Sequence, residues 1–456
     1  MTLRPVPGQV LSRWVKWWKW IGCVISDARC MSTLVTSIPL RANNSLSTSN
    51  RFGSRWNVLS PGKRNELELM DFAKLKLLDG SSVLKPMDSS GSLACLSVRF
   101  ALKFNPTEKN TSDVLCKQVK HHMRLCLAVT AGQEKFITLA GSEPLLAEAA
   151  YELVNRSESN PVWHLDKHSE LNCVDRGRRG ELVATLLIMQ VFDAARAIIG
   201  SRWVSVDAFM KELLPERPYR VLHGSLPTFS RHGQNHNIVD TFRGYGMWFN
   251  HVIKIEDNSM FMADHLWKFV TRGAMILCVD GQEGIDIVLP VCDTQRTLSR
   301  ETVTGIFIQV KNDEKYQLKI DEMLFDRMSP VKLGLFPDDV DPKPVIRLVL
   351  ALALKDAGVS FPEVREREPH HANSFTAFDV WIVGLSAAAH KHIEKDLSSY
   401  INLLDRSLWP HDAFNMLDDD RMEDEARQSR GDARRKMAPL TLKDVRHNYV
   451  HMSKGK

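Results

Sequence analysis

The chain has 456 residues, of which 44% are hydrophobic and 25% charged, a composition typical of a globular protein with more than one packed unit. The formal charge of +5 is concentrated near the start: residues 1–55 hold eight Lys/Arg and one acid, which leaves 52 basic and 54 acidic residues in 56–456. Composition therefore excludes a broadly basic nucleic-acid-binding body, and any phosphate-contacting patch must be local.

Residues 1–59 form a basic leader with the tryptophan-rich stretch "SRWVKWWKWIGCVISDARC". A membrane-surface amphipathic helix and an organelle transit segment are two interpretations of this stretch. The Ser/Asn/Arg-rich residues that follow favour a third, a disordered leader outside the folded unit. A secretory signal is disfavoured because no clean apolar stretch with a small-residue cleavage site is present.

No apolar run reaches the roughly eighteen uncharged residues that a bilayer span needs, so the sequence predicts no transmembrane segment. The eight cysteines include no Cys-x-x-Cys pair, which disfavours a disulfide framework and a zinc site. Together these features favour an intracellular protein, with the nucleus as one option.

Residues 60–170 are predicted to be mainly helical. Apolar residues at helical spacing precede Gly80, and a second helix follows Ser142 as N-cap with Pro144 in its first turn. Between them, the apolar run 93–104 is interpreted as strand-like.

Residues 171–355 are predicted to form the core. A helix over 180–199 is apolar on most sides, which indicates burial. Short apolar runs bounded by loops predict three consecutive strands. A further helix and an apolar run follow, and residues 201–270 are interpreted as an insertion that folds away from the core. The expected ranges after the helix are strands 274–280, 286–291 and 305–311, helix 315–328, and strand 345–354. An extension over 356–415, with one strand and one helix, and a charged tail over 416–456 complete the organisation.

Two polar residues end the third predicted strand, "GIFIQVK". Because side chains alternate along a strand, Gln309 and Lys311 share one face. If 286–291 and 305–311 form an antiparallel hairpin, Asp286 at the start of the first strand lies beside them. A carboxylate, an amide oxygen and a main-chain carbonyl suit a hard divalent cation, and an ammonium suits an attacking water or a phosphate.

The segments "GID" and "IQVK", with this order of helices and strands, resemble the PD-(D/E)XK, or restriction-endonuclease-like, nuclease superfamily in its Gln-x-Lys, Mrr-type variant. The resemblance implies an α/β fold with an α-β-β-β-α-β core, a long insertion and helical extensions at both ends. It implies Mg²⁺- or Mn²⁺-dependent cleavage of DNA. Asp286, Gln309 and Lys311 would form the site, with Glu181 as auxiliary acid, and Asp286, Gln309 and Glu181 as metal ligands.

Glu181 lies 105 positions before Asp286, unlike the usual core helix, so Asp280 and Glu283 are alternatives for the auxiliary acid. The Gln in place of Glu removes one negative charge from the site. This favours a second interpretation, a catalytically inactive nuclease-fold module that acts as an interaction or effector protein.

A wider likeness over roughly residues 110–410 links the chain to uncharacterised fungal families associated with Crinkler-like effectors and mobile elements. Those families often carry an NTPase module. The chain lacks a Gly-x-x-x-x-Gly-Lys-[Ser/Thr] loop, so an NTPase would have to reside on a separate partner. The sequence indicates no oligomeric state.

Two further sets of residues are expected to be structural. Arg347, in the last apolar run of the core, could contact phosphate, but an ion pair to a nearby acid is favoured. His164 and His168 lie one helical turn apart without a third ligand, and no Gly-x-Ser-x-Gly elbow supports a hydrolase triad.

Overall fold

The computed structural model describes most of residues 69–405, so the expected leader (1–59) and charged tail (416–456) lie outside the described residues. The gaps are 86–88, 101, 103–108, 130–135, 157–160, 168–175, 231–235, 314, 317–318, 337–338, 354–355 and 365–374. The described chain divides into two compact units, a small one within 104–139 and a large one built from 67–103 and 140–408.

The small unit contains one helix and one hairpin. Helix α6 spans Lys109–His121, and strands β1 (Leu125–Val129) and β2 (Phe136–Leu139) pair antiparallel with Leu125 opposite Leu139. The Nε of Arg124 donates a 2.6 Å hydrogen bond to the Thr138 hydroxyl, which ties the hairpin together at its base.

The first part of the large unit is helical. The interpretation of 93–104 as strand-like is wrong, because most of it lies in helix α5. Residues 91–100 of that helix are all buried, so the sequence has no polar face to reveal the helical period. The helices are α4 (Leu69–Leu77), α5 (Ser89–Phe100), α7 (Pro144–Arg156), α8 (Pro161–Lys167) and α9 (Arg176–Ile199).

Helix α9 is the one helix among the described residues that is long and apolar enough to cross a membrane, over 179–199. Most of this stretch is buried inside the protein, as expected for the core helix predicted from the sequence.

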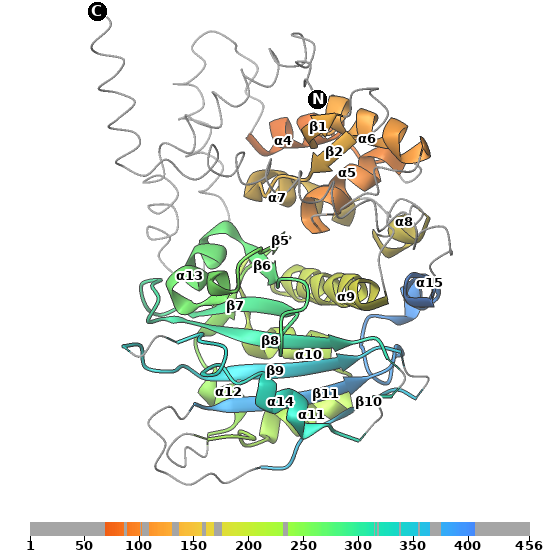
Figure 1. The fold of residues 1–456 in the computed structure, drawn as a ribbon. Helices are drawn as coiled ribbons and strands as arrows, with labels where there is room; N and C mark the ends of the chain where they lie inside the picture. Colours follow the sequence, from red (N-terminus) through yellow and green to blue (C-terminus); the bar gives the residue numbers. More distant parts are fainter. Residues whose placement is uncertain are drawn as a thin grey trace, which may run out of the picture. The chain divides into compact units, whose positions relative to one another are not determined.

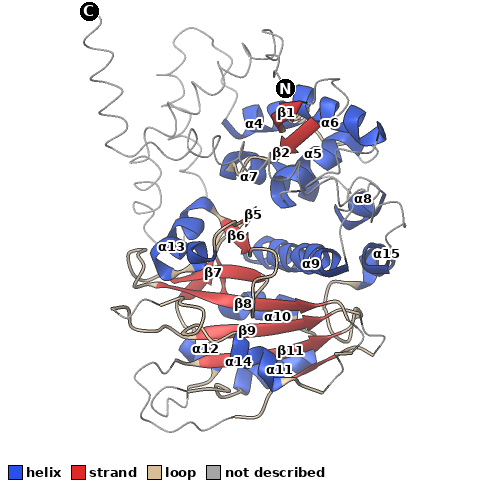
Figure 2. Ribbon diagram, viewed as in Figure 1, coloured by secondary structure: helices blue, strands red, loops and turns tan. Residues whose placement is uncertain are grey.

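A mixed sheet forms the centre of the large unit (Figures 1 and 2). Its main path runs β10-β11-β9-β8-β7-β4-β3, while β6 also pairs with β7 and β5 pairs with β6. The pairs β6–β7 and β7–β8 are antiparallel, whereas β8–β9 and β9–β11 are parallel. The expected α/β class is confirmed. The strands are β3 (Val204–Ser205), β4 (Tyr245–Met247), β5 (His251–Lys254), β6 (Ala274–Leu277), β7 (Ile287–Asp293), β8 (Val303–Lys311), β9 (Val345–Ala351), β10 (Gly358–Ser360) and β11 (Ala377–Val383).

The expectation that residues 201–270 fold away from the core is wrong. This segment contributes β3, β4 and β5 to the sheet, and Gly246 of β4 pairs directly with Cys292 of β7. The sequence does not predict these strands, because each is only two to four residues long and therefore too short to show period-two alternation.

Helices cover both faces of the sheet. The N-terminal turn of α9 contacts Val310 of β8, whereas α13 and α14 share a hydrophobic cluster with Phe307 on the opposite face. The expected helix 315–328 is shorter, because Asp321 accepts the Met323 N–H and so caps the helix at Glu322. The remaining helices are α10 (Val206–Leu213), α11 (Glu216–Gly224), α12 (Ile238–Thr241), η2 (Asn258–Phe261), α13 (Ala263–Arg272), α14 (Glu322–Arg327), η3 (Glu394–Asp396) and α15 (Leu397–Asp405).

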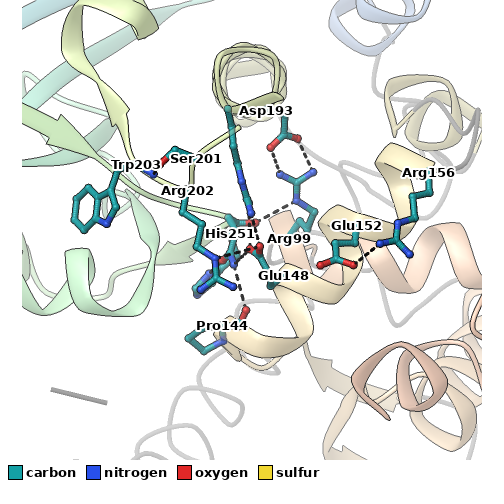
Figure 3. Close-up of polar contacts among 12 residues, drawn as sticks. Arg99, Pro144, Glu148, Glu152, Arg156, Asp193, Ser201, Arg202, Trp203 and His251 are labelled. Carbon is teal, nitrogen blue, oxygen red and sulfur yellow. Dashed lines mark hydrogen bonds and ion pairs between the residues drawn. The ribbon is translucent and has the colours of Figure 1, made fainter. Parts of the chain in front are cut away.

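Paired charges join α9 to α5 and α7 (Figure 3). Arg99 donates to both carboxylate oxygens of Asp193 at 2.8 and 2.9 Å, and Arg196 donates to both oxygens of Glu148. Asn250 adds a 2.9 Å hydrogen bond to Glu148. Every one of these carboxylate oxygens has a donor, as buried charges require.

Candidate functional site

The candidate site lies where strands β7 and β8 separate. The register pairs Ile287 with Ile308, so the predicted antiparallel pairing of these two strands is confirmed, and Asp286 directly precedes the first paired residue of β7. The Asp286 N–H donates to the Ile308 carbonyl at 2.9 Å, and the Asp286 Oδ2 accepts the Val310 N–H at 2.6 Å. A side-chain oxygen therefore replaces the main-chain acceptor of the ladder, and the carboxylate is fixed in the fork between the strands.

Gln309 is only 4% exposed, and its side-chain Oε1 has no hydrogen-bond partner among the described residues. An unpaired buried polar atom costs free energy on the order of 1–3 kcal/mol. Such an atom calls for an explanation, and the capacity to bind an ion or a water is one of the few available. The amide oxygen is of the type that Mg²⁺ and Mn²⁺ prefer.

Lys311 lies on the same face as Gln309, two residues further along β8. Burial lowers the pKa of its ammonium, with Arg327 and Lys315 acting in the same direction, while the Asp286 carboxylate opposes them. Its Nζ lies 5.9 Å from the centre of the Tyr316 ring. Among the described residues, no carboxylate lies within ion-pair distance of Lys311, so its ammonium is not committed to a structural ion pair.

The pKa of the Asp286 carboxyl is raised. Burial is the dominant cause, and it outweighs the opposing effects of the Val310 N–H and the Lys311 ammonium. The surroundings of a carboxylate with a raised pKa stabilise its charged form poorly. A bound cation would supply the missing stabilisation.

The main chain of Val310 supplies a third oxygen. In a strand the N–H and C=O of one residue point to the same side, and the Val310 N–H points toward Asp286. Its carbonyl therefore faces the fork as well. Among the described residues no group of three His, Cys, Asp or Glu could hold a metal ion. The oxygen set here is instead one carboxylate, one amide and one carbonyl, which fits a divalent cation with several ligands left to water.

Glu181 and Asp286 both act on the Cys278 thiol, despite their long separation in the sequence. Burial raises the pKa of the Cys278 thiol well above its usual value, and the carboxylates of Asp286 and Glu181 raise it further. Both acids therefore lie near one thiol. A Cβ on Gly180 would come within 2.9 Å of Asn312, so the start of α9 packs tightly on the end of β8.

The two alternatives to Glu181 have other contacts. Asp280 forms an ion pair with Lys254, and Glu283 pairs with Arg327 at 3.5 Å on an exposed surface. Neither contact directs its carboxylate toward Asp286, which leaves Glu181 as the better candidate for the auxiliary acid.

Gly284 positions Asp286, and sequence reasoning gave it no role. Its φ of +88° is favourable for glycine alone, and a Cβ there would lie 2.5 Å from the Arg327 carbonyl oxygen. The turn before Asp286 thus packs directly on the end of α14. The signal available in the sequence was the glycine two residues before the acid.

The expected ion pair of Arg347 is confirmed. Arg347 and Asp379 are direct neighbours on β9 and β11, and two hydrogen bonds of 2.6 and 2.7 Å join them. Arg347 also donates to the Phe325 carbonyl of α14 at 2.7 Å. His164 shares a 3.2 Å hydrogen bond with Ser92, while His168 lies outside the described residues.

A serine–histidine pair exists outside the predicted site (Figure 3 labels the histidine). The Ser142 hydroxyl and His251 Nε2 lie 2.8 Å apart, and His251 Nδ1 lies 2.8 Å from the Asn250 side-chain oxygen. Burial and then the Arg272 charge lower the pKa of His251 to about 3. This imidazole is a weak base, so the chain of contacts serves to hold β5 to the segment before α7.

A family model described as a domain of unknown function, DUF8736, matches residues 85–332, more than half of the chain. The chain belongs to the DUF8736 family. The matched segment includes Glu181, Asp286, Gln309 and Lys311. No curated protein and no solved structure matches the chain. The family name carries no function, so any assignment for this DUF8736 protein depends on the geometry of the site.

Proposed function

We propose that this protein is a metal-dependent nuclease that hydrolyses phosphodiester bonds in DNA. The observation that carries the proposal is the buried, unpaired Oε1 of Gln309, next along β8 to Val310, whose N–H binds the buried Asp286 carboxylate. Both side chains offer oxygen atoms of the kind that a hard divalent cation binds.

The order of elements supports the restriction-endonuclease-like interpretation. The elements α9, β6, β7, β8, α14 and β9 follow the helix-strand-strand-strand-helix-strand order of that core, with additional elements between α9 and β6. Asp286 immediately precedes the second of these strands, and Gln309 and Lys311 lie at the end of the third. Fold alone does not define activity, so the side chains carry the argument.

In the proposed mechanism Asp286, Gln309 and the Val310 carbonyl would hold Mg²⁺ or Mn²⁺, with Glu181 as the candidate auxiliary acid. A divalent cation at this point would activate a water and neutralise charge on the phosphate. Lys311 orients the attacking water through its ammonium and stabilises charge that develops on the phosphate oxygens.

The test is a cleavage assay with the purified full chain. Wild-type protein is incubated with plasmid DNA, single-stranded DNA and RNA in Mg²⁺, Mn²⁺ or EDTA. We expect metal-dependent cutting of DNA, abolished in Asp286→Ala and unchanged in Asp240→Ala, which removes an exposed acid of α12. Cutting that persists in Asp286→Ala would contradict the assignment, and cutting of RNA alone would change the substrate.

The second candidate is a nuclease-fold module without catalysis that acts as an interaction or effector protein. Gln309 favours it, because a neutral amide in place of a carboxylate weakens metal binding. A folded wild-type protein that neither binds Mn²⁺ nor cuts any of the substrates would select this alternative. An NTPase on a separate partner remains compatible with both proposals.

A further inference from the structure

A small polar cavity lies on the same sheet face as Gln309. Its walls come from β9 and β11, from α14 with the segment after it, and from the segments at Thr228–Phe229 and Phe375. Its volume is about 40 Å³, and one water needs about 10–15 Å³ on this measure. The cavity thus has room for about three to four water-sized atoms, comparable to the four oxygens of one tetrahedral oxyanion.

Arg347 lines the cavity, and only some of its N–H groups donate hydrogen bonds within the protein. Arg347 is 5% exposed and has five N–H groups, of which Asp379 and the Phe325 carbonyl accept three. Two N–H groups therefore have no partner among the described residues. The guanidinium lies 5.7 Å from the Phe325 ring and 5.6 Å from the Phe375 ring, so its plane is held in place.

Three more donors line the walls. The Thr228 hydroxyl accepts the Asp379 N–H, and the Ser329 hydroxyl accepts the Lys332 N–H, so both hydroxyl protons stay available. Within the described chain, the exposed Lys332 ammonium makes no ion pair. The unused hydrogen-bonding capacity of this cavity therefore consists largely of donors, and a ligand rich in acceptor oxygens complements it.

The charges lining the cavity are balanced. Arg347 and Lys332 are positive, whereas Asp379 and Asp326 are negative. Both oxygens of Asp379 already accept from Arg347, so Asp326 is the one carboxylate that would oppose an anion. Its repulsion is weaker for a singly charged phosphodiester than for a dianionic phosphate.

The cavity is close to the candidate catalytic site. Arg347 precedes Val349 by two residues on β9, about 7 Å along the strand, and Val349 is the direct neighbour of Gln309. Helix α14 contacts both places, through the Phe325 carbonyl at the cavity and the Arg327 carbonyl at Gly284. A strand of nucleic acid could therefore place successive phosphates at the two points.

We propose that this cavity binds a phosphate group and anchors a nucleic-acid strand next to the bond that is cut. The identity of the phosphate carrier rests on the proposed nuclease function, whereas phosphate binding itself does not. The three possible carriers are an internal phosphodiester, a terminal phosphate and free inorganic phosphate, which share the chemistry that the donors recognise.

The first experiment measures binding without divalent ions, so that cleavage plays no part. Inorganic phosphate is titrated into the full chain by calorimetry in a phosphate-free buffer. We expect Lys332→Ala and Ser329→Ala each to weaken binding roughly tenfold, since a hydrogen bond to a charged group contributes about 1.5 kcal/mol or more. Lys395→Ala, which removes an exposed ammonium outside the cavity, should bind as the wild type does. Arg347 is left intact because its loss would remove two hydrogen bonds from the buried Asp379 carboxylate.

The outcomes separate this proposal from the nuclease proposal. Asp286→Asn should keep phosphate binding even though cleavage is lost. Absence of phosphate binding in the wild type, or equal binding in Lys332→Ala and Ser329→Ala, would overturn the cavity assignment. Loss of phosphate binding in Asp286→Asn would overturn it as well, because the anion would then be at the candidate catalytic site.

The second experiment identifies the carrier by fluorescence anisotropy. Oligonucleotides with a 5′-hydroxyl, a 5′-phosphate or a 3′-phosphate are compared on Asp286→Asn and on the same protein carrying Lys332→Ala. If Lys332→Ala lowers the affinity for all three oligonucleotides equally, the cavity binds an internal phosphodiester. If it lowers the affinity only for the oligonucleotide with one kind of phosphorylated end, the cavity binds that terminal phosphate. No change for any oligonucleotide would refute the role as a nucleic-acid anchor.

Discussion

Two buried polar regions of the large unit differ in how completely their groups are paired. Around Glu148, both carboxylate oxygens accept from Arg196, and Asn250 and Arg99 complete the set of contacts between helices (Figure 3). In the fork between β7 and β8, Gln309 keeps an unpaired oxygen. The first region is built to hold helices together, and the second retains binding capacity that the fold does not use. The predictions below test this difference, starting with the largest expected effect.

The strongest effect is expected at the paired region. Glu148→Ala leaves Arg196 buried without its partner, so the free energy of unfolding should fall by about 3–5 kcal/mol, measured by urea denaturation. The matched control is Glu216→Ala, which removes an exposed pair with Arg220 and should cost under about 0.5 kcal/mol. Similar losses in both variants would show that the Glu148 contacts do not hold the helices together.

Substitution of Gly284 tests how strongly its contact with α14 constrains the turn before Asp286. Gly284→Ala combines a strained φ with a clash against the Arg327 carbonyl, so stability should fall by about 2–3 kcal/mol. Gly281→Ala has a similar φ of +76° but open space, so it should lose only about 1 kcal/mol. Thermal unfolding would compare the two. Equal losses would mean that the contact with α14 does not constrain the turn before Asp286.

Gln309 tests whether the unpaired oxygen is a ligand. Gln309→Glu adds a second carboxylate beside Asp286 and should tighten Mn²⁺ binding roughly tenfold in calorimetry, because ligand charge governs affinity for hard cations. Gln309→Met keeps a similar volume without the oxygen and should lose measurable Mn²⁺ binding. Unaltered affinity in both variants would exclude this side chain from the metal site.

Asp286 should show the smallest effect on stability, with the opposite sign. Its folded-state pKa is raised, so the folded protein loses stability as pH rises from the unfolded-state pKa through the folded-state pKa. The penalty is fully present above the folded-state pKa. Asp286→Asn should therefore stabilise the metal-free protein above that pKa, with the gain vanishing at acidic pH below the unfolded-state pKa.

The control for this experiment is Asp293→Asn, at the other end of β7, which should change little. Thermal unfolding in EDTA across the pH range provides the measurement. Destabilisation of Asp286→Asn at pH 7 would mean that the carboxylate is a structural group like Glu148.

The strands around the candidate site were predicted better than the rest of the fold. Alternation along β8 was enough to place Gln309 and Lys311 on one face, and the predicted antiparallel pairing of β7 with β8 is confirmed, whereas a catalytic role for these residues stays a prediction. Helix α5 was mistaken for a strand because it is buried on every side and so lacks a polar face. The very short strands β3 to β5 carry no periodic signal, and their pairing depends on partners far along the chain.

Other features of the site depend on contacts that no local pattern records. The start of α9, which carries Glu181, packs on β8 through Gly180 and Asn312, and Gly284 packs against the end of α14. The bond from Val310 to the Asp286 carboxylate replaces a regular ladder bond, which a simple pairing rule does not anticipate. The positions of these residues around the candidate site therefore depend on tertiary contacts, which a local sequence pattern does not contain.

The pairing of β8 with β9 limits how this protein can be shortened. The family match ends at residue 332, before β9 and β11, whereas β8 forms a parallel ladder with β9 from Ile306 to Lys311. A fragment ending there would leave a nine-residue apolar strand as an open sheet edge, a template for aggregation. The minimal independently folding piece should accordingly reach at least Val383, beyond the boundary that family membership defines.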